Sequence, residues 1–304
     1  MLDNTIYSQN WRLIGKSVTG AVHQLHNKTS QDCFKIHNEE PLILAVADGH
    51  GSQNSPFSDL GAQLAVEVGV DTCLKFYNHA KQSNLKLDMI KQMAEEELPK
   101  IIVKEWVQKV TDDYQSRRDI IEGSLDIGSL LVKYGSTLLI ALLSPNFHIY
   151  LQLGDGDILL VDEKGIVSSP ISRDQRLIGN QTTSLCSPEA WKEIRTAFFS
   201  SHEPLPALIL LASDGYSNSY KSEADFHKVG QDYHFLAQKY GIKLIEEKLE
   251  EWLHEVSAQG SGDDITACLA FRSMIYPGDD QVNTDDADKK SSACSSADIQ
   301  SVRE

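Results

Sequence analysis

The chain has 304 residues, 41% of them hydrophobic and 24% charged, a composition typical of a soluble globular protein with one large domain or two ordinary ones. Its net charge of −16 argues against a nucleic-acid partner, and no apolar run reaches the roughly 18 residues that a membrane span needs. The N-terminus has no secretory signal and the five cysteines form no CxxC pair, so we expect a cytoplasmic protein without disulfides or zinc.

Short apolar runs bounded by turn residues predict seven β-strands. Several runs, such as LILAVA at residues 42–47, are apolar at every position, which indicates strands that are covered on both faces. In chain order the predicted strands are Cys33–Ile36, Leu42–Ala47, Thr137–Leu143, His148–Leu153, Ile158–Val161, Ala207–Ala212 and Thr266–Phe271.

Helical spacing of apolar residues predicts helices after the second strand and again before the last one. The predicted segments are Ser58–Phe76, Leu85–Tyr114 and Leu236–Val256. In the second of them, Pro99 must begin, end or kink a helix. Because the helices follow groups of strands and do not alternate with them, we predict an α+β fold, in which antiparallel sheets pack together with helices outside.

Two segments lack a periodic pattern. Residues 165–206 hold several turn residues, and we expect a long, partly irregular flap at the edge of an active site. Residues 277–304 carry seven acids and three bases but no aromatic residue or leucine, so they cannot bury enough surface to fold. We therefore expect one domain over residues 1–276 and an acidic, disordered tail over residues 277–304.

Five aspartates stand at the ends of predicted strands. Asp48, Asp155 and Asp214 follow a strand, whereas Asp32 and Asp263 precede one. In an antiparallel sheet the end of one strand lies beside the start of its neighbour, so all five can gather at one edge. Glycines flank four of these acids. One Asp-Gly pair is a common turn, but four at strand ends favour a ligand site.

Two predicted hairpins make this gathering specific. The first places Asp32 next to Asp48, and the second places Gly135–Thr137 next to Asp155. Converging carboxylates repel one another unless cations neutralise them. Oxygen ligands favour Mg²⁺ or Mn²⁺ over zinc, and two such ions about 4 Å apart can activate water and clamp a phosphate.

Six motifs occur in order along the chain: Gln31-Asp32, Ala47–Gly51, Gly135–Thr137, Leu153–Asp157, Ala212–Gly215 and Gly262–Thr266. Together with residues 58–62 and 180–185, they resemble the type 2C (PPM) metal-dependent protein phosphatases, in particular the bacterial branch. The resemblance implies a four-layer α-β-β-α sandwich of two antiparallel sheets flanked by helices. It also implies an enzyme that hydrolyses phosphoserine and phosphothreonine in a protein substrate.

The resemblance further implies a metal centre with two Mn²⁺ or Mg²⁺ ions. Asp48 and the carbonyl of Gly49 would bridge the two ions. Asp214 and Asp263 would complete the first metal site. Asp32 would act at the second site through water.

Two more roles follow from the resemblance. Asp155 matches a carboxylate of a weaker third metal site, which Asp214 can share. His50 matches a histidine assigned as general acid, and it follows Asp48 closely enough to protonate the leaving serine oxygen. The implied reaction is in-line attack of a metal-bound water on phosphorus.

Two positions depart from the family pattern. Many members have a phosphate-gripping arginine where this chain has Asn27. The residues that could replace it are His23, Lys28, Arg173 and Arg176. The usual asparagine after the last metal aspartate is Asp264 here, which adds negative charge close to the metals.

Two other functions compete with a phosphatase. A catalytically weak pseudophosphatase would only bind phosphoproteins, but it would be expected to lack a metal carboxylate or His50, and all are present. A two-metal nuclease would need a basic track, which the net charge disfavours. We expect a monomer whose partners are a phosphorylated protein and a cognate serine/threonine kinase.

Overall fold

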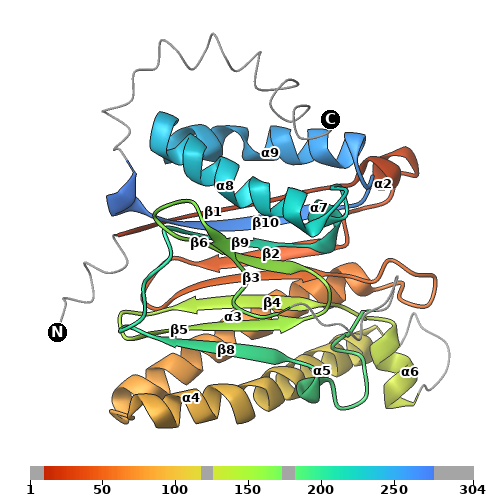
Figure 1. Ribbon diagram of the computed structural model, residues 1–304. Coiled ribbons are helices and arrows are strands. Elements are labelled where there is room, and N and C mark those ends of the chain that lie inside the picture. The colour runs from red at the N-terminus through yellow and green to blue at the C-terminus, as the bar shows by residue number, and fades with distance from the viewer. Residues whose placement is uncertain (1–9, 118–125, 173–181, 277–304) are drawn as a thin grey trace.

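Two five-stranded antiparallel sheets form the centre of the molecule (Figure 1). The computed structural model describes residues 10–117, 126–172 and 182–276, so the predicted acidic tail lies outside the described residues. In spatial order, the first sheet contains β1 (Trp11–Val18), β10 (Ile265–Arg272), β9 (Leu208–Ala212), β6 (Asp157–Val161) and β7 (Val167–Ser168). The second sheet contains β2 (Asp32–His37), β3 (Leu42–Asp48), β4 (Leu138–Leu143), β5 (Phe147–Leu153) and β8 (Arg195–Ser200).

Helices cover the outer face of each sheet, which gives the four-layer α+β sandwich that the sequence predicts (Figure 1). The first sheet is covered by α8 (Glu223–Tyr240) and α9 (Ile242–Gln259), and the second by α3 (Ser58–Gln82), α4 (Leu87–Glu96) and α5 (Leu98–Ser116). The described connections also hold the short elements α2 (Ala21–Leu25), α6 (Ile127–Val132), α7 (Asp214–Ser217), η1 (Ala190–Lys192) and η2 (Ser273–Ile275). No described helix combines the length and the apolar character needed to cross a bilayer.

The central strands are apolar at every position because both of their faces are buried. In β3, Leu42, Leu44 and Val46 pack between the two sheets. The alternate residues Ile43 and Ala45 pack against the helices that cover the second sheet. Burying a side chain such as leucine stabilises the fold by roughly 1.5–3 kcal/mol. Apolar packing on both faces therefore holds β3 between the other sheet and the covering helices.

Two of the predicted helices are in fact pairs of helices. The prediction Leu236–Val256 is wrong in its bounds, because Gly241 separates α8 from α9. Gly241 has a φ of 80°, which glycine adopts without strain, and the apolar spacing resumes directly after it. Pro99 lies in the first turn of α5, where its missing N–H costs nothing, so Leu85–Tyr114 also contains two helices.

The predicted flap over residues 165–206 is more ordered than the sequence suggests. Its described part contains β7, η1 and β8, and β8 pairs along its length with β5. All six residues of β8 are half-buried at the sheet edge, so they show neither a buried run nor a clear alternation. β1 also escapes the strand pattern, because Arg12 and Lys16 interrupt it to pair with Glu246 and Glu250 on α9.

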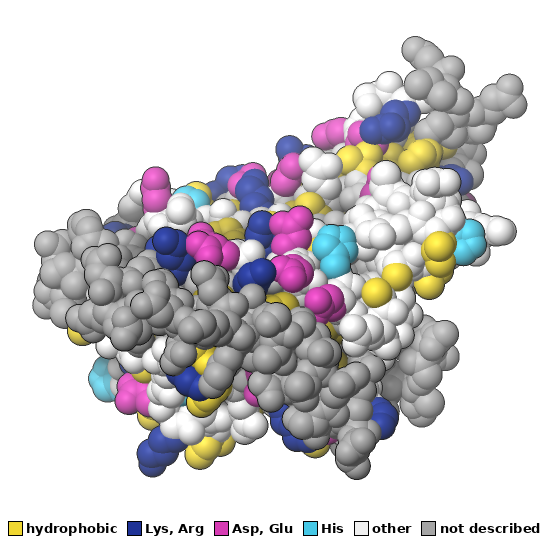
Figure 2. Space-filling model, turned by 90° about the horizontal axis from the view of Figure 1, so that it is seen from above, with side chains coloured by type: hydrophobic (Ala, Val, Ile, Leu, Met, Phe, Trp, Pro, Cys, Tyr) yellow, Lys and Arg dark blue, Asp and Glu magenta, His cyan; other side chains and the backbone are white. Residues whose placement is uncertain are grey.

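The outward face of α8 and α9 carries acidic and basic side chains in alternation (Figure 2). Lys243 pairs with Glu247, and Lys248 pairs with Glu251. Exposed pairs of this kind add only about 0.3–0.5 kcal/mol each. They leave no continuous basic track among the described residues visible on this face.

Candidate active site

The hairpin of β2 and β3 sets two aspartates side by side. Their register pairs Asp32 directly with Asp48, as the sequence predicts. Beyond the end of β3, Gly49 forms an isolated bridge with Ser136. The N–H of Thr137 donates to the carbonyl of Asp48 at 2.8 Å, and the N–H of Asp48 donates to Thr137 Oγ1 at 3.0 Å. The segment that leads into β4 is thereby fixed against the end of β3.

The hairpin of β4 and β5 brings Asp155 to the same edge, next to the segment Gly135–Thr137, as predicted. Thr182 Oγ1 donates to Asp155 Oδ1 at 2.9 Å. The N–H of Gly154 donates to Thr183 Oγ1, also at 2.9 Å. The two threonines therefore orient the turn that carries Asp155.

The first sheet supplies two further aspartates. Asp214 follows β9 and opens α7, and Asp263 precedes β10. Asn218, which directly follows the last residue of α7, donates Nδ2–H to Asp214 Oδ2 at 2.9 Å. Ser213 reaches across the sandwich, because its hydroxyl donates to Asp32 Oδ2 at 2.6 Å. The two sheets are therefore joined at the edge where the aspartates gather.

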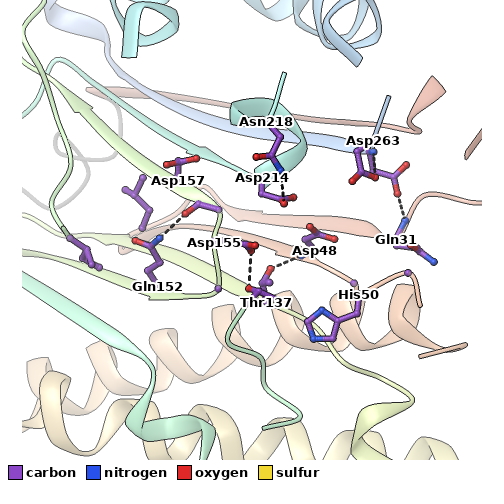
Figure 3. A pocket seen from close by; sticks show the side chains of 18 of the residues that line it. Gln31, Asp48, His50, Thr137, Gln152, Asp155, Asp157, Asp214, Asn218 and Asp263 are labelled. Atoms are coloured by element: carbon purple, nitrogen blue, oxygen red, sulfur yellow. Dashed lines mark hydrogen bonds between the residues drawn. The ribbon is translucent and has the colours of Figure 1, made fainter. Parts of the chain in front are cut away.

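Four of the five aspartates line one cavity of about 610 Å³. Figure 3 shows Asp48, Asp155 and Asp214 around a common space, with Asp263 to one side. Asp32 is not among the lining residues of this cavity, and its Oδ2 instead accepts the hydrogen bond from Ser213. The convergence that the strand ends predict is thus present, with one carboxylate set back from the cavity.

Burial and mutual repulsion disfavour the charged forms of these carboxylates. The pKa of Asp48 is raised well above its usual range, first by burial and then by the charges of Asp32 and Asp214. Burial also raises the pKa of Asp214, and repulsion from Asp155 is the next cause. Burial raises the pKa of Asp32 to about 7, although a hydrogen bond from Ser213 opposes this shift.

This arrangement fits hard divalent cations. Carboxylates from both sheets converge, and their oxygen atoms are the donors that Mg²⁺ and Mn²⁺ prefer. Oδ1 of Asp32 is buried without a hydrogen-bond partner among the described residues, so it has acceptor capacity to spare. Bound cations would remove the repulsion that raises the pKa values of Asp48 and Asp214.

His50 also lines the cavity. The backbone N–H of His50 donates to the carbonyl of Gly135 at 3.1 Å, and the imidazole ring of His50 lies directly against the Cα of that glycine. Burial lowers the pKa of His50, and the charge of nearby Asp155 acts in the opposite direction. The thiol of Cys186 approaches Gly135 as well, and it contacts the hydroxyl of Ser184 at 3.2 Å. His50 is therefore placed to exchange a proton inside the cavity.

The predicted phosphate contacts differ in their positions. His23 lines the cavity, whereas Lys28 is exposed and is not among the lining residues. Asn27 is exposed as well, and its φ of 51° is a left-handed conformation that asparagine tolerates. Arg173 and Arg176 lie outside the described residues. Of these candidates, the described structure brings His23 to the aspartates.

Several cavity residues, among them Arg195, Asn218 and Thr182, were not singled out by their sequence context. Arg195 comes from β8, and no local pattern marks it. Asn218 could be found, because it stands four residues after Asp214, one turn along a helix. Thr182 lies within the segment 180–185 that contributes to the family resemblance, but its contact with a carboxylate needs the fold.

Comparison with known proteins adds a family match. A sequence model of the family described as protein phosphatase 2C matches residues 19–254 of the chain. No curated protein gives a significant match.

Solved structures with a similar fold include serine/threonine and serine phosphatases. The catalytic domain of the serine threonine protein phosphatase PstP, in complex with two manganese ions, has a TM-score of 0.53 and 18% identity, over 86% of this chain and 97% of that one. PppA, a key regulatory component of T6SS in Pseudomonas aeruginosa, has a TM-score of 0.55 and 20% identity over the same shares. A bacterial serine phosphatase has a TM-score of 0.53 and 14% identity, again over the same shares. At these identities the likeness shows a common fold.

Proposed function

The chain belongs to the protein phosphatase 2C family of protein serine/threonine phosphatases, and from this premise we propose that it hydrolyses phosphoserine and phosphothreonine in a protein substrate at the carboxylate cavity. The observation that carries the proposal is the convergence of Asp48, Asp155, Asp214 and Asp263 from both sheets around one cavity that also contains His50. A phosphorylated protein substrate implies a serine/threonine kinase that forms the phosphate ester. We therefore propose such a kinase as the partner of this protein.

The proposed ligands of two Mn²⁺ or Mg²⁺ ions are the aspartates at the strand ends. Asp48 and the Gly49 carbonyl would hold both ions, and Asp214 and Asp263 would complete the site of the first ion. Asp32 would act at the second ion through water, which agrees with its absence from the residues that line the cavity. When bound, such ions lower the pKa of a coordinated water from about 15.7 towards 7 and offset charge on the phosphoryl oxygens. PstP, which shares the fold, was solved with two manganese ions.

A weaker third ion is proposed at Asp155. Asp214 lies close enough to repel Asp155, so the two carboxylates can share a cation. Thr182 holds one oxygen of Asp155 by a hydrogen bond, which fixes its direction. An ordered carboxylate loses less freedom on binding, so this contact supports a site there.

The protein's own side chains handle the proton and the phosphate. We assign His50 as the general acid that protonates the leaving serine or threonine oxygen. Burial lowers the pKa of His50, which makes its protonated ring a stronger acid. Of the two phosphate contacts expected from the sequence, His23 and Lys28, we propose His23, because it lines the cavity and Lys28 does not.

The proposal is tested with the purified protein and phosphoserine and phosphothreonine peptides. We expect turnover with Mn²⁺ or Mg²⁺ and none with a chelator. Asp48→Asn should abolish turnover and leave the circular dichroism spectrum unchanged. Asp88→Asn, on the exposed side of α4, is the matched control and should keep full activity.

The turnover assay, together with phosphopeptide binding and nucleic-acid cleavage assays, separates the competing functions. Activity that survives chelation would contradict a metal-dependent mechanism. Binding of phosphopeptide without any turnover would favour the pseudophosphatase. Cleavage of a nucleic acid would favour a nuclease, although the mixed charges of the α8 and α9 face do not support a polyanion track there (Figure 2).

A further inference from the structure

Asp264 is a buried carboxylate that holds three donors at the wall of the cavity. Only 4% of its side chain is exposed. Oδ1 accepts the N–H of Gly20 at 2.7 Å and bonds to Nδ1 of His23 at 2.9 Å. Oδ2 accepts the N–H of Gln31 at 2.7 Å. Backbone donors on both oxygens suit a carboxylate, because an asparagine would turn its own NH₂ toward one of them.

These contacts fasten His23 to the loop that carries a metal-site aspartate. Asp264 directly follows Asp263, and a ring nitrogen of His23 lies within 4.8 Å of a carboxylate oxygen of Asp263. The helix α2 is tied to the same loop, because the N–H of Val22 donates to the carbonyl of Gly262 at 2.9 Å. The backbone and the ring of His23 are therefore held by the site itself.

The ring of His23 has one nitrogen left for a ligand. Asp264 engages Nδ1, and no described residue forms a hydrogen bond with Nε2. His23 lines the same cavity as Asp48 and Asp214. With Nδ1 held by the carboxylate of Asp264, Nε2 on the far side of the ring can donate to a phosphoryl oxygen in the cavity.

We propose that His23 contacts the phosphoryl group of the substrate and that Asp264 is its positioning residue. The inference rests on the proposed phosphatase function and adds to it the group that orients the phosphate contact. Asn27 and Lys28 are exposed and do not line the cavity. The pair of His23 and Asp264 therefore supplies from the start of α2 a contact that those two positions do not make.

The test compares His23→Ala with His26→Ala in the full-length, Mn²⁺-loaded protein. His26 is a matched control, because it ends the same short helix, is exposed, and bonds through its ring to the carbonyl of Val22. We expect His23→Ala to raise both the KM for a phosphoserine peptide and the inhibition constant of inorganic phosphate roughly 10- to 100-fold, the effect of one hydrogen bond to a charged group. Its Mn²⁺ affinity, measured by calorimetry, should stay at the wild-type value. His26→Ala should leave all three quantities unchanged.

Asp264→Asn tests the positioning role. It should raise the same two constants, because the ring of His23 loses the charged acceptor of its Nδ1–H. The double variant of His23→Ala and Asp264→Asn should be no weaker than His23→Ala alone, since Asp264 acts through His23. Additive losses would overturn the positioning role. If Asp264→Asn fails to fold by circular dichroism, His23→Ala still decides the phosphate contact.

Two results for His23→Ala would overturn the phosphate contact. One is a wild-type KM together with wild-type phosphate inhibition. The other is weakened Mn²⁺ binding with an unchanged KM, which would make His23 a metal ligand. If the wild-type protein hydrolyses no phosphopeptide, the proposed function fails. Calorimetric titration of the Mn²⁺-loaded protein with inorganic phosphate then still tests the pair.

Discussion

At the scale of single residues, the site consists of carboxylates whose charged forms the fold disfavours. Asp48 and Asp214 both have raised pKa values, with burial as the largest cause. A raised pKa in the folded state means that stability is present at low pH and is lost as the pH rises through that value. Repulsion between the carboxylates contributes to this loss, and a divalent cation would relieve that repulsion. Stability without metal and affinity for metal therefore oppose each other.

Asp214→Asn should separate these two effects. In the presence of a chelator at pH 8, we expect a higher free energy of unfolding than in the wild type, because an amide does not repel Asp48 and Asp155. With Mn²⁺, phosphopeptide turnover should fall by roughly 100-fold or more. Urea denaturation in chelator and a turnover assay measure the two quantities. A lower free energy of unfolding for Asp214→Asn than for the wild type in chelator would contradict the claim that repulsion among the aspartates destabilises the metal-free protein.

His148 provides a test of buried charge far from the aspartates. It lies against Trp11 and Tyr150, and burial lowers its pKa from 6.5 to about 3, with Arg272 as a second cause. The unfolded chain binds the proton first, so stability present above pH 6.5 is lost as the pH falls towards 3, by up to about 1.4 kcal/mol per unit. His148→Gln should show a shallower slope between pH 6.5 and 4.5 in urea denaturation. An unchanged slope would contradict a neutral, buried ring.

At the scale of elements, the sequence predicts buried strands well and edges poorly. β3 and β10 are buried on both faces, so their continuous apolar runs mark them clearly. Counting along the first hairpin is enough to pair Asp32 with Asp48, because the antiparallel register follows from the turn. β1 and β8 are half-buried edge strands, and their charged or mixed residues hide the alternation. The break at Gly241 is hidden because the apolar spacing continues on both sides.

The site divides in the same way. The strand-end argument finds the five aspartates, since their positions depend on local sequence and strand order. The contacts that orient the site are not local. Thr182 meets Asp155 across 27 positions of the chain, and His23 meets Asp264 across 241. Only the packed sandwich reveals such pairs, so the sequence identifies Asp264 as a departure without indicating its partner.

Two glycines of α3 test how this helix supports the site. A Cβ on Gly61 would stand 1.9 Å from the carbonyl oxygen of Tyr134, in the backbone that leads to β4. A Cβ on Gly69 would meet only the flexible tip of Ile140, at 2.8 Å. We expect Gly61→Ala to cost about 3 kcal/mol and to reduce turnover, because Tyr134 immediately precedes the residue that packs on His50.

Gly69→Ala is the matched control for that substitution. Its cost should stay within about 1 kcal/mol, because the higher helix propensity of alanine offsets a small repacking. Chemical denaturation of both variants measures the difference. Equal losses would contradict the assignment of a rigid backbone contact at Gly61.

At the scale of the whole molecule, the cavity belongs to both sheets. Asp32 and Asp48 come from the second sheet, whereas Asp214 and Asp263 come from the connections of the first. Cations bound among them would link the two halves of the sandwich. Because the unfolded chain does not assemble these ligands, metal binding and folding are coupled.

Mn²⁺ should therefore stabilise the entire domain. At a free concentration 100 times the dissociation constant, we expect the free energy of unfolding to rise by about 2.7 kcal/mol. Denaturation with and without Mn²⁺ measures the shift, and excess chelator should reverse it. Asp48→Asn should lose most of the shift. If the free energy of unfolding did not change with Mn²⁺, binding of the ion by ligands from both sheets would be contradicted.

The hydroxyl of Ser213 joins the two sheets at the edge that carries the aspartates. It donates to Asp32 in the opposite sheet and accepts the N–H of Thr266, so it sets the spacing of the sheets at their reactive edge. Farther from this edge, interior side chains such as Leu44 of β3 and Leu211 of β9 pack between the sheets. Substitutions in that interior that keep its volume should leave this polar bridge, and the ligands beside it, in place. The interior can diverge widely in sequence while the chemistry keeps its geometry.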